Sequence, residues 1–166
     1  MANEVVKHAV VRTDLMAGTD VRSKLVSIEY LGADGNTPTA IDNGNILKVG
    51  ALVEGEREIY VGGVPTAETK ANEVVLVASV EVMYDERKQN LDEFENEVGD
   101  IIRGYRLESG DVFSVTAEAL SGRPAKGSKV GIGAGTKLVV GNTNAIGTII
   151  DVEVAGRYTY YVIKVD

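Results

Sequence analysis

The stretch from residue 98 to residue 120 reads VGDIIRGYRLESGDVFSVTAEAL and indicates the fold class. It consists of two short apolar runs joined by Ser-Gly-Asp at residues 109–111. In the second run Phe113 and Val115 alternate with polar neighbours, and this period of two is typical of a β-strand with one buried face. A Gly-Asp pair between two such runs favours a β-hairpin. We therefore expect two strands here, joined by a tight turn.

The rest of the chain repeats this pattern of short apolar runs and glycine turns. Asn43-Gly44 predicts a hairpin between Ile41 and Ile46, and Gly62-Gly63 predicts another turn. In the run 146–154 the even-numbered residues are expected to share one buried face. Further strands are expected at residues 25–31, 58–61, 74–82, 137–140, 146–154 and 158–165.

These features predict an all-β protein, a small β-barrel or β-sandwich of short antiparallel strands. We assign residues 23–166 to this β-domain, and the loop-like stretch SGRPAKGS at 121–128 is a candidate boundary between two lobes. Residues 1–22 lack a regular period and are expected to form an irregular N-terminal arm, with an irregular first strand as the alternative. Such an arm orders on a partner, so deleting residues 2–20 should leave the β-domain folded.

Composition limits the classes of partner. The formal net charge is −8, with 25 acidic and 17 basic residues, and it repels phosphates and anionic lipids. We therefore expect neither nucleic acid nor a membrane as a partner. The chain has no cysteine, which excludes disulfides and thiolate chemistry. Its first residues do not resemble a signal peptide, and no apolar run reaches the roughly 20 residues of a membrane-spanning helix.

No nucleophile, base and orienting group can be assembled from the sequence, so we expect no enzyme, no cofactor and no metal site. The glycine-rich stretch GIGAGTK at residues 131–137 lacks the spacing of a phosphate-binding loop and is expected to be a turn. His8 is the only histidine and has no catalytic partner near it in the sequence, so we expect it to be solvated or to cap a turn.

Two acidic stretches invite a calcium-site interpretation. The tetrapeptide DNGN at residues 42–45 and the acidic run at residues 85–100 both lack the ligand spacing of a calcium loop. We expect the first to be a turn and the second to be an exposed, metal-free excursion. Tyr158, Tyr160 and Tyr161 suggest a sugar platform, but the chain has no tryptophan, and strand alternation places Tyr161 inside with Ile163 and Val165. We therefore expect these rings to pack in the core and at its edge.

Five residues are candidates for a partner interface, because arginine and tyrosine are enriched at protein interfaces. Arg12 and Arg22 lie in the predicted arm of an otherwise acidic protein. Arg103 and Tyr105 are expected to share one face of a strand, with Arg106 on the other face.

The order of several segments resembles that of decoration proteins, also called cement or auxiliary head proteins, of tailed bacteriophages. The resemblance is one of style and segment order, without a signature motif, so no residue roles carry over. It lies wholly from Asp42 onward and covers nearly half of the chain, in DNGNILKVGALVEG, VVLVASVEVMYDE, FENEVGDIIRGYRLESGDVFSVTAEAL and GTIIDVEVAGRYTYYVIKV.

The resemblance implies a non-enzymatic virion protein, made in the host cytoplasm, that binds the outside of the phage capsid. Its partner would be the major capsid protein, whose neighbouring subunits it would bridge to stabilise the shell. Some proteins of this class are trimers and others are monomers, so further copies of the chain are a second possible partner. The alternatives are a tail or head-completion protein and a carbohydrate-binding β-module.

Overall fold

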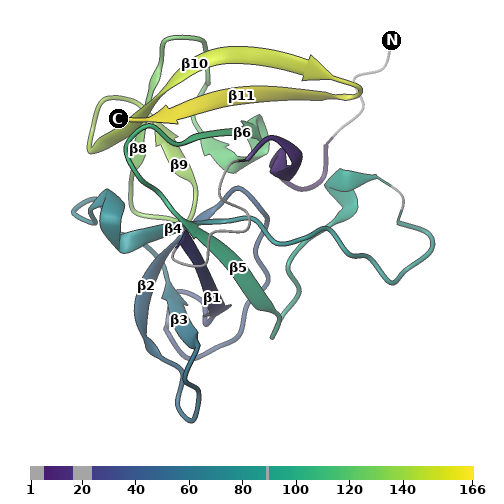
Figure 1. Cartoon of the computed structure of the whole chain (residues 1–166), viewed down its shortest axis with the longest axis vertical. Helices are drawn as coiled ribbons and strands as arrows, with labels where there is room; N and C mark the ends of the chain where they lie inside the picture. Colours follow the sequence, from purple (N-terminus) through teal and green to yellow (C-terminus); the bar gives the residue numbers. More distant parts are fainter. Residues whose placement is uncertain (1–5, 17–23, 89) are drawn as a thin grey trace.

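The fold is all-β, as the sequence predicts (Figure 1). The computed structural model describes residues 6–16, 24–88 and 90–166. In these residues helical structure is confined to short 3₁₀ turns, including η1 (Thr13–Leu15), η3 (Ala71–Glu73), η4 (Leu91–Glu93) and η5 (Ala117–Ala119). No helix among them is long and apolar enough to cross a membrane.

The first five strands close into a barrel, in the order β1-β3-β2-β4-β5. The barrel is small, and glycines permit its tight packing. A Cβ atom on Gly104 would lie 2.6 Å from a methyl group of Val75, and one on Gly62 would lie 2.5 Å from a methyl group of Ile28. Gly62 and Gly63 both lie in the strand Ile59–Gly63, so the turn predicted at Gly62-Gly63 is wrong. The strands are β1 (Leu25–Tyr30), β2 (Ile46–Leu52), β3 (Ile59–Gly63), β4 (Val74–Val77) and β5 (Ile101–Arg106).

The other six strands form one curved sheet above the barrel in Figure 1, in the order β6-β11-β10-β8-β9-β7. One cluster of buried side chains joins the two sheets, with Leu76 and Tyr105 from the barrel and Phe113, Ile149 and Ile163 from the second sheet. The strands are β6 (Val112–Thr116), β7 (Leu120–Ser121), β8 (Lys129–Ile132), β9 (Leu138–Val140), β10 (Ala145–Ala155) and β11 (Tyr158–Val165).

The hairpin predicted for residues 98–120 is wrong. Both runs are strands, but β5 pairs with β1 and β4, whereas β6 pairs with β11. The turn at residues 109–111 therefore connects the two sheets. The chain passes from one sheet to the other between β5 and β6. The predicted lobe boundary at residues 121–128 instead connects β7 to β8, which belong to the same sheet.

Side-chain hydrogen bonds and a bulge explain three further differences. Asn43-Gly44 is a turn but not a hairpin, because Ile41 bridges Asn96 instead of pairing with β2. The predicted strand 74–82 ends at Val77, since the Asn43 side chain donates to the Ser79 carbonyl and accepts from the Ser79 amide. In β10 it is Ile149 that packs into the core, with a bulge between it and Asp151; Ile150 is exposed there, and Val152 and Val154 are exposed because the end of the hairpin extends past the core.

The described part of the predicted arm is an additional edge of the second sheet. Val11 bridges Val115, the Thr116 amide donates to the Val10 carbonyl, and the Arg12 amide donates to the Ser114 carbonyl. Ala9, Val10 and Val11 are each 2% exposed. The run shows no period of two because both of its faces are buried: Val11 packs into the shared core, and Val10 packs on Tyr158 and Tyr160.

This burial predicts that the N-terminal segment, residues 6–16, stabilises the fold. We expect Val11→Ala to lower the free energy of unfolding by about 2 kcal/mol, from two lost methyl groups and the cavity they leave. Leu15→Ala, at an exposed position of the same segment, should change it by less than about 0.5 kcal/mol. Urea denaturation measures both variants. Equal stability of Val11→Ala and the parent protein would restore the interpretation as a dispensable arm.

Candidate functional site

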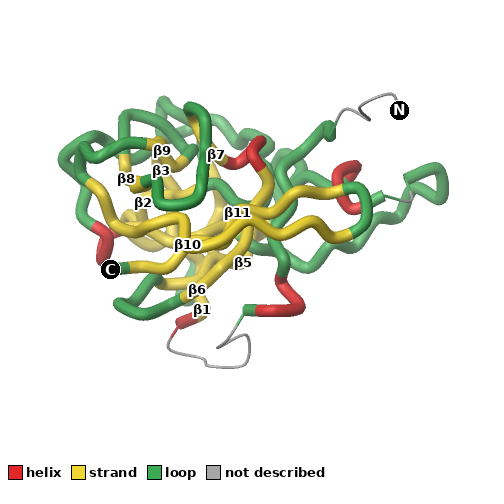
Figure 2. Tube along the Cα trace, turned by 90° about the horizontal axis from the view of Figure 1, so that it is seen from above, coloured by secondary structure: helices red, strands yellow, loops and turns green. Residues whose placement is uncertain are grey.

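Three parts of the chain meet on one side of the molecule and form a groove of about 520 Å³. They are the N-terminal segment, the free end of the β10–β11 hairpin, and the excursion, residues 78–100, between β4 and β5. Figure 2 shows the hairpin end and the excursion projecting on the same side of the two sheets. The groove is lined mainly by Arg12, Asp14, Glu81, Leu91, Arg157 and Tyr158.

Two arginines cover the tyrosines on the groove side. The guanidinium of Arg12 lies 5.3 Å from the ring centroid of Tyr160, and that of Arg157 lies 5.6 Å from the ring centroid of Tyr158. Tyr158 and Tyr160 are only 7% and 3% exposed. The two tyrosines therefore pack, as expected for these rings, although the alternation places Tyr161 inside and not these two. Because the guanidinium groups attract the ring faces, neither ring is an open platform for a sugar.

A buried carboxylate, Asp92, connects the three parts of the site. It accepts hydrogen bonds from the Lys7 amide at 3.0 Å and from the Tyr158 hydroxyl at 2.8 Å, and Arg157 lies 3.7 Å away. Burial raises the pKa of Asp92, but these hydrogen bonds and the charge of Arg157 outweigh it, so the net pKa is lowered. Asp92 is 2% exposed. The expectation of a fully exposed acidic run is therefore wrong at this position.

The lowered pKa predicts that ionised Asp92 stabilises the fold. This contribution is fully present above the pKa of an unfolded aspartate and is lost as the pH falls through the lower folded value. We expect Asp92→Asn to cost about 1–3 kcal/mol at pH 7, because an amide cannot accept both hydrogen bonds.

The cost should shrink as the pH falls below the ordinary aspartate pKa. Urea denaturation at pH 7 and at low pH measures it, with exposed Glu86→Gln as the control. A cost that does not change with pH would show that the charge of Asp92 has no part in it.

The pKa of a second carboxyl group in the groove, that of Glu81, is shifted in the opposite direction. Burial in the groove raises its pKa, and the neighbouring Asp14 raises it further. The ionised form of Glu81 is therefore disfavoured by folding. Side chains with shifted pKa values are more frequent at functional sites, where binding requires ionisable groups to be held away from water.

The raised pKa predicts that Glu81 costs stability at neutral pH. As the pH rises from the unfolded to the folded pKa, the unfolded state loses its proton first, and the native state loses stability. We expect Glu81→Gln to raise the melting temperature at pH 7 and to raise it less at pH 4. Differential scanning calorimetry at both pH values tests this, again with Glu86→Gln as the control. A lower melting temperature of Glu81→Gln at pH 7 would contradict it.

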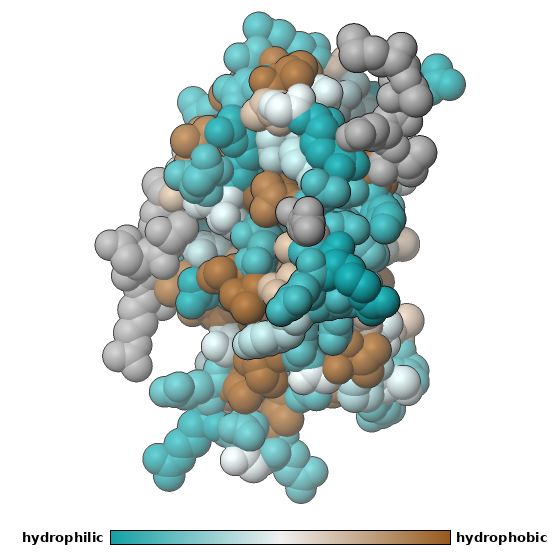
Figure 3. Space-filling model, turned by 90° about the vertical axis from the view of Figure 1, so that its right-hand side faces the viewer, coloured by the Kyte–Doolittle hydropathy of each residue, from teal (hydrophilic) through white to brown (hydrophobic). Residues whose placement is uncertain are grey.

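The excursion exposes apolar side chains in alternation. Val80, Val82 and Tyr84 are 60%, 53% and 95% exposed, whereas Glu81 and Met83 between them are partly buried. Among the described residues, none bonds to the backbone amide of Met83 or Tyr84. Figure 3, which shows the side toward which the excursion projects, has apolar patches set in a polar surface. The excursion thus presents the side chains of Val80, Val82 and Tyr84 on an apolar outer face.

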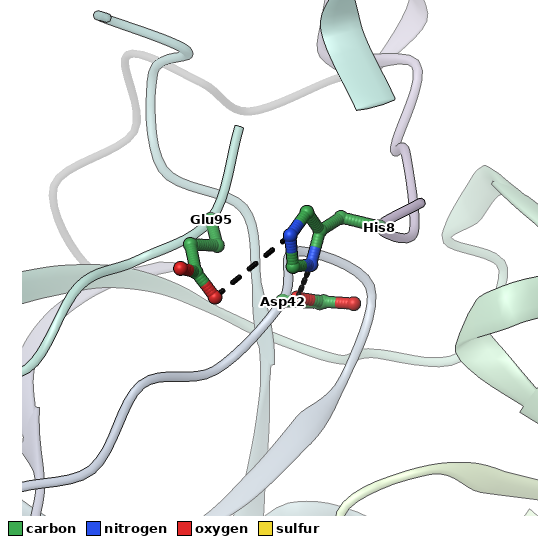
Figure 4. A group of neighbouring side chains, drawn as sticks. All are labelled: His8, Asp42 and Glu95. Atoms are coloured by element: carbon green, nitrogen blue, oxygen red, sulfur yellow. Dashed lines mark hydrogen bonds and ion pairs between the residues drawn. The ribbon is translucent and has the colours of Figure 1, made fainter. Parts of the chain in front are cut away.

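A second cluster joins His8, Asp42 and Glu95 (Figure 4). His8 Nδ1 lies 2.7 Å from Asp42 Oδ1, and His8 Nε2 lies 3.9 Å from Glu95 Oε2. The other oxygen of Asp42 accepts a hydrogen bond from the Ala9 amide at 3.2 Å. His8 is therefore neither simply solvated nor a cap. Only the folded chain brings these residues together, since 33 positions separate His8 from Asp42 and 52 separate Asp42 from Glu95. The donor atoms, one nitrogen and two carboxylate groups, are of the kind that hold a transition-metal ion.

The predicted interface residues lie in different parts of the fold. Arg12 lies in the groove, where it pairs with Asp14 at 3.3 Å and with Glu153 at 3.4 Å. Arg22 lies outside the described residues. The other three predicted residues are on β5.

On β5, Arg103 is exposed and its amide donates to Ser79 Oγ, so it adjoins the base of the excursion. Tyr105 is buried in the core that joins the sheets and presents no surface to a partner in this conformation. Arg106 is exposed beside a pocket that Leu15 and Leu107 also line.

No family model, no curated protein and no solved structure matches the chain. The groove, the excursion and the histidine cluster are therefore the features of the chain that bear on its function.

Proposed function

We propose that the protein is a non-enzymatic decoration protein of a tailed-phage capsid. It binds the outer surface of the shell and stabilises it by bridging major capsid subunits. The observation that carries the proposal is the row of exposed apolar side chains at Val80, Val82 and Tyr84. Exposed apolar surface on an otherwise polar protein marks a protein-binding site, and tyrosine is enriched in such sites.

The architecture supports a mechanical role. A closed barrel has no free strand edge, and here its outer face is fused to a second sheet through one core. Such a body transmits load between two contacts without opening. The excursion, which projects from it, is suited to reach a neighbouring subunit, while the acidic surface keeps the free protein soluble.

The carbohydrate-binding alternative has less support, because Tyr158 and Tyr160 are covered by arginines. The proposal places the protein on the exterior of the virion, with the major capsid protein as its partner. Self-association into trimers is compatible with this role. Ring formation without capsid binding would instead favour a tail or head-completion protein.

The proposal predicts that the apolar row of the excursion binds capsids. We expect the triple variant Val80→Ser, Val82→Ser, Tyr84→Ser to bind undecorated capsids of the encoding phage at least about 10-fold more weakly, since buried aromatic anchors dominate interface energy. Its melting temperature should stay close to that of the parent, because all three side chains are exposed.

Co-sedimentation with capsids measures the binding, and the heat resistance of the shells measures the stabilisation. The control is the double variant Leu52→Ser, Val139→Ser, which removes exposed apolar side chains outside the excursion. If the parent protein neither sediments with capsids nor protects them from heat, the decoration role is excluded. If the triple variant binds like the parent, the excursion is not the contact.

A further inference from the structure

We propose that His8, Asp42 and Glu95 form a zinc site. The main evidence is the separation of 3.9 Å between His8 Nε2 and Glu95 Oε2. This gap is too long for a hydrogen bond, which spans about 2.7–3.2 Å. Two tetrahedral zinc ligands, each about 2.1 Å from the metal, lie about 3.4 Å apart. A side-chain movement of about 0.5 Å would therefore let both atoms ligate one ion.

Asp42 has the second role that such sites require. A histidine that ligates through one nitrogen nearly always donates the N–H of its other nitrogen to a carboxylate or carbonyl, which fixes the tautomer. Here Asp42 Oδ1 lies 2.7 Å from Nδ1, and the Ala9 amide holds the other Asp42 oxygen in place. Nε2 is thereby directed toward Glu95, as Figure 4 shows. His8 Nε2 and Glu95 would be the direct ligands, and water would complete the coordination.

The surroundings favour a cation and select among cations. The three side chains are 23–34% exposed, so an ion can enter from solvent. An imidazole nitrogen beside carboxylates suits zinc, whereas calcium takes oxygen ligands alone. The donor atoms of this cluster therefore suit zinc and not calcium. The proposal is separate from a calcium loop, whose ligand spacing the acidic run does not have.

A metal bound here would join three distant parts of the chain: the N-terminal segment, the turn before β2, and the excursion. Because the unfolded chain would not hold these groups together, binding would stabilise the native state in proportion to the logarithm of the free zinc concentration. The inference does not depend on the capsid role and can fail or hold without it.

The chain is unusually well suited to a test, since it has one histidine and no cysteine. Titration of the untagged protein with zinc chloride in a calorimeter should show one ion per chain, and the NMR signals of the single imidazole should shift with it. Glu95→Gln should abolish this binding while leaving the metal-free melting temperature unchanged, because the His8–Asp42 contact remains. Asp42→Asn should weaken binding by about 10- to 100-fold.

Glu97→Gln is the matched control, an acidic neighbour outside the cluster, and should bind zinc like the parent. Calcium should not compete. The proposal is overturned if zinc leaves the imidazole signals unmoved, if Glu95→Gln binds zinc as the parent does, or if Glu97→Gln loses as much affinity as Glu95→Gln.

Discussion

The core shared by the barrel and the second sheet is the constraint on which the rest of the structure depends. A five-stranded barrel has little interior, and here glycines at positions 62 and 104 keep it small. Much of the apolar surface of the barrel therefore faces outward, as at Leu76 and Tyr105, and must be covered by another layer. The second sheet provides this layer. Neither sheet would be well buried alone, so the two sheets are best regarded as one folding unit.

This constraint also explains the overhang that forms the site. β10 and β11 are the longest strands, and the residues nearest their shared turn extend past the core. On one face of the overhang Val152 and Val154 are exposed. On the other face the N-terminal segment and Asp92 cover Tyr158 and Tyr160. The groove lies where this covering layer meets the excursion.

The sequence predicts the fold class and most strands, because alternation and glycine turns are local signals. It does not predict pairing. The turn at 109–111 has the composition of a hairpin, but β5 pairs with β1 and β6 pairs with β11, in different sheets. The run Ala9-Val10-Val11 has no period because it is buried on both faces, so a buried edge segment resembled an irregular arm. Alternation also placed Ile150, Val152 and Val154 inside, because no sequence period reveals a bulge or shows that the end of the hairpin extends past the core.

The candidate site was still harder to predict, because its residues come from distant parts of the chain. Asp92 and Glu81 look alike in the sequence, yet folding lowers the pKa of one and raises that of the other. Only their surroundings differ. The Asp92 carboxylate accepts hydrogen bonds from the Lys7 amide and the Tyr158 hydroxyl, whereas Glu81 lies near another carboxylate, that of Asp14. No local pattern distinguishes these two environments.

The contacts of the N-terminal segment change the role it has in the proposed function. The arm hypothesis had it order on a partner, but its amides at Lys7 and His8 bond Asp92, which belongs to the excursion. His8 and Ala9 contact Asp42, beside the turn whose Asn43 holds Ser79 at the base of the excursion. The segment thus supports the excursion at both ends. Because a binding loop held in one conformation loses less entropy on association, the segment would, in the proposed function, strengthen capsid binding by positioning Val80, Val82 and Tyr84.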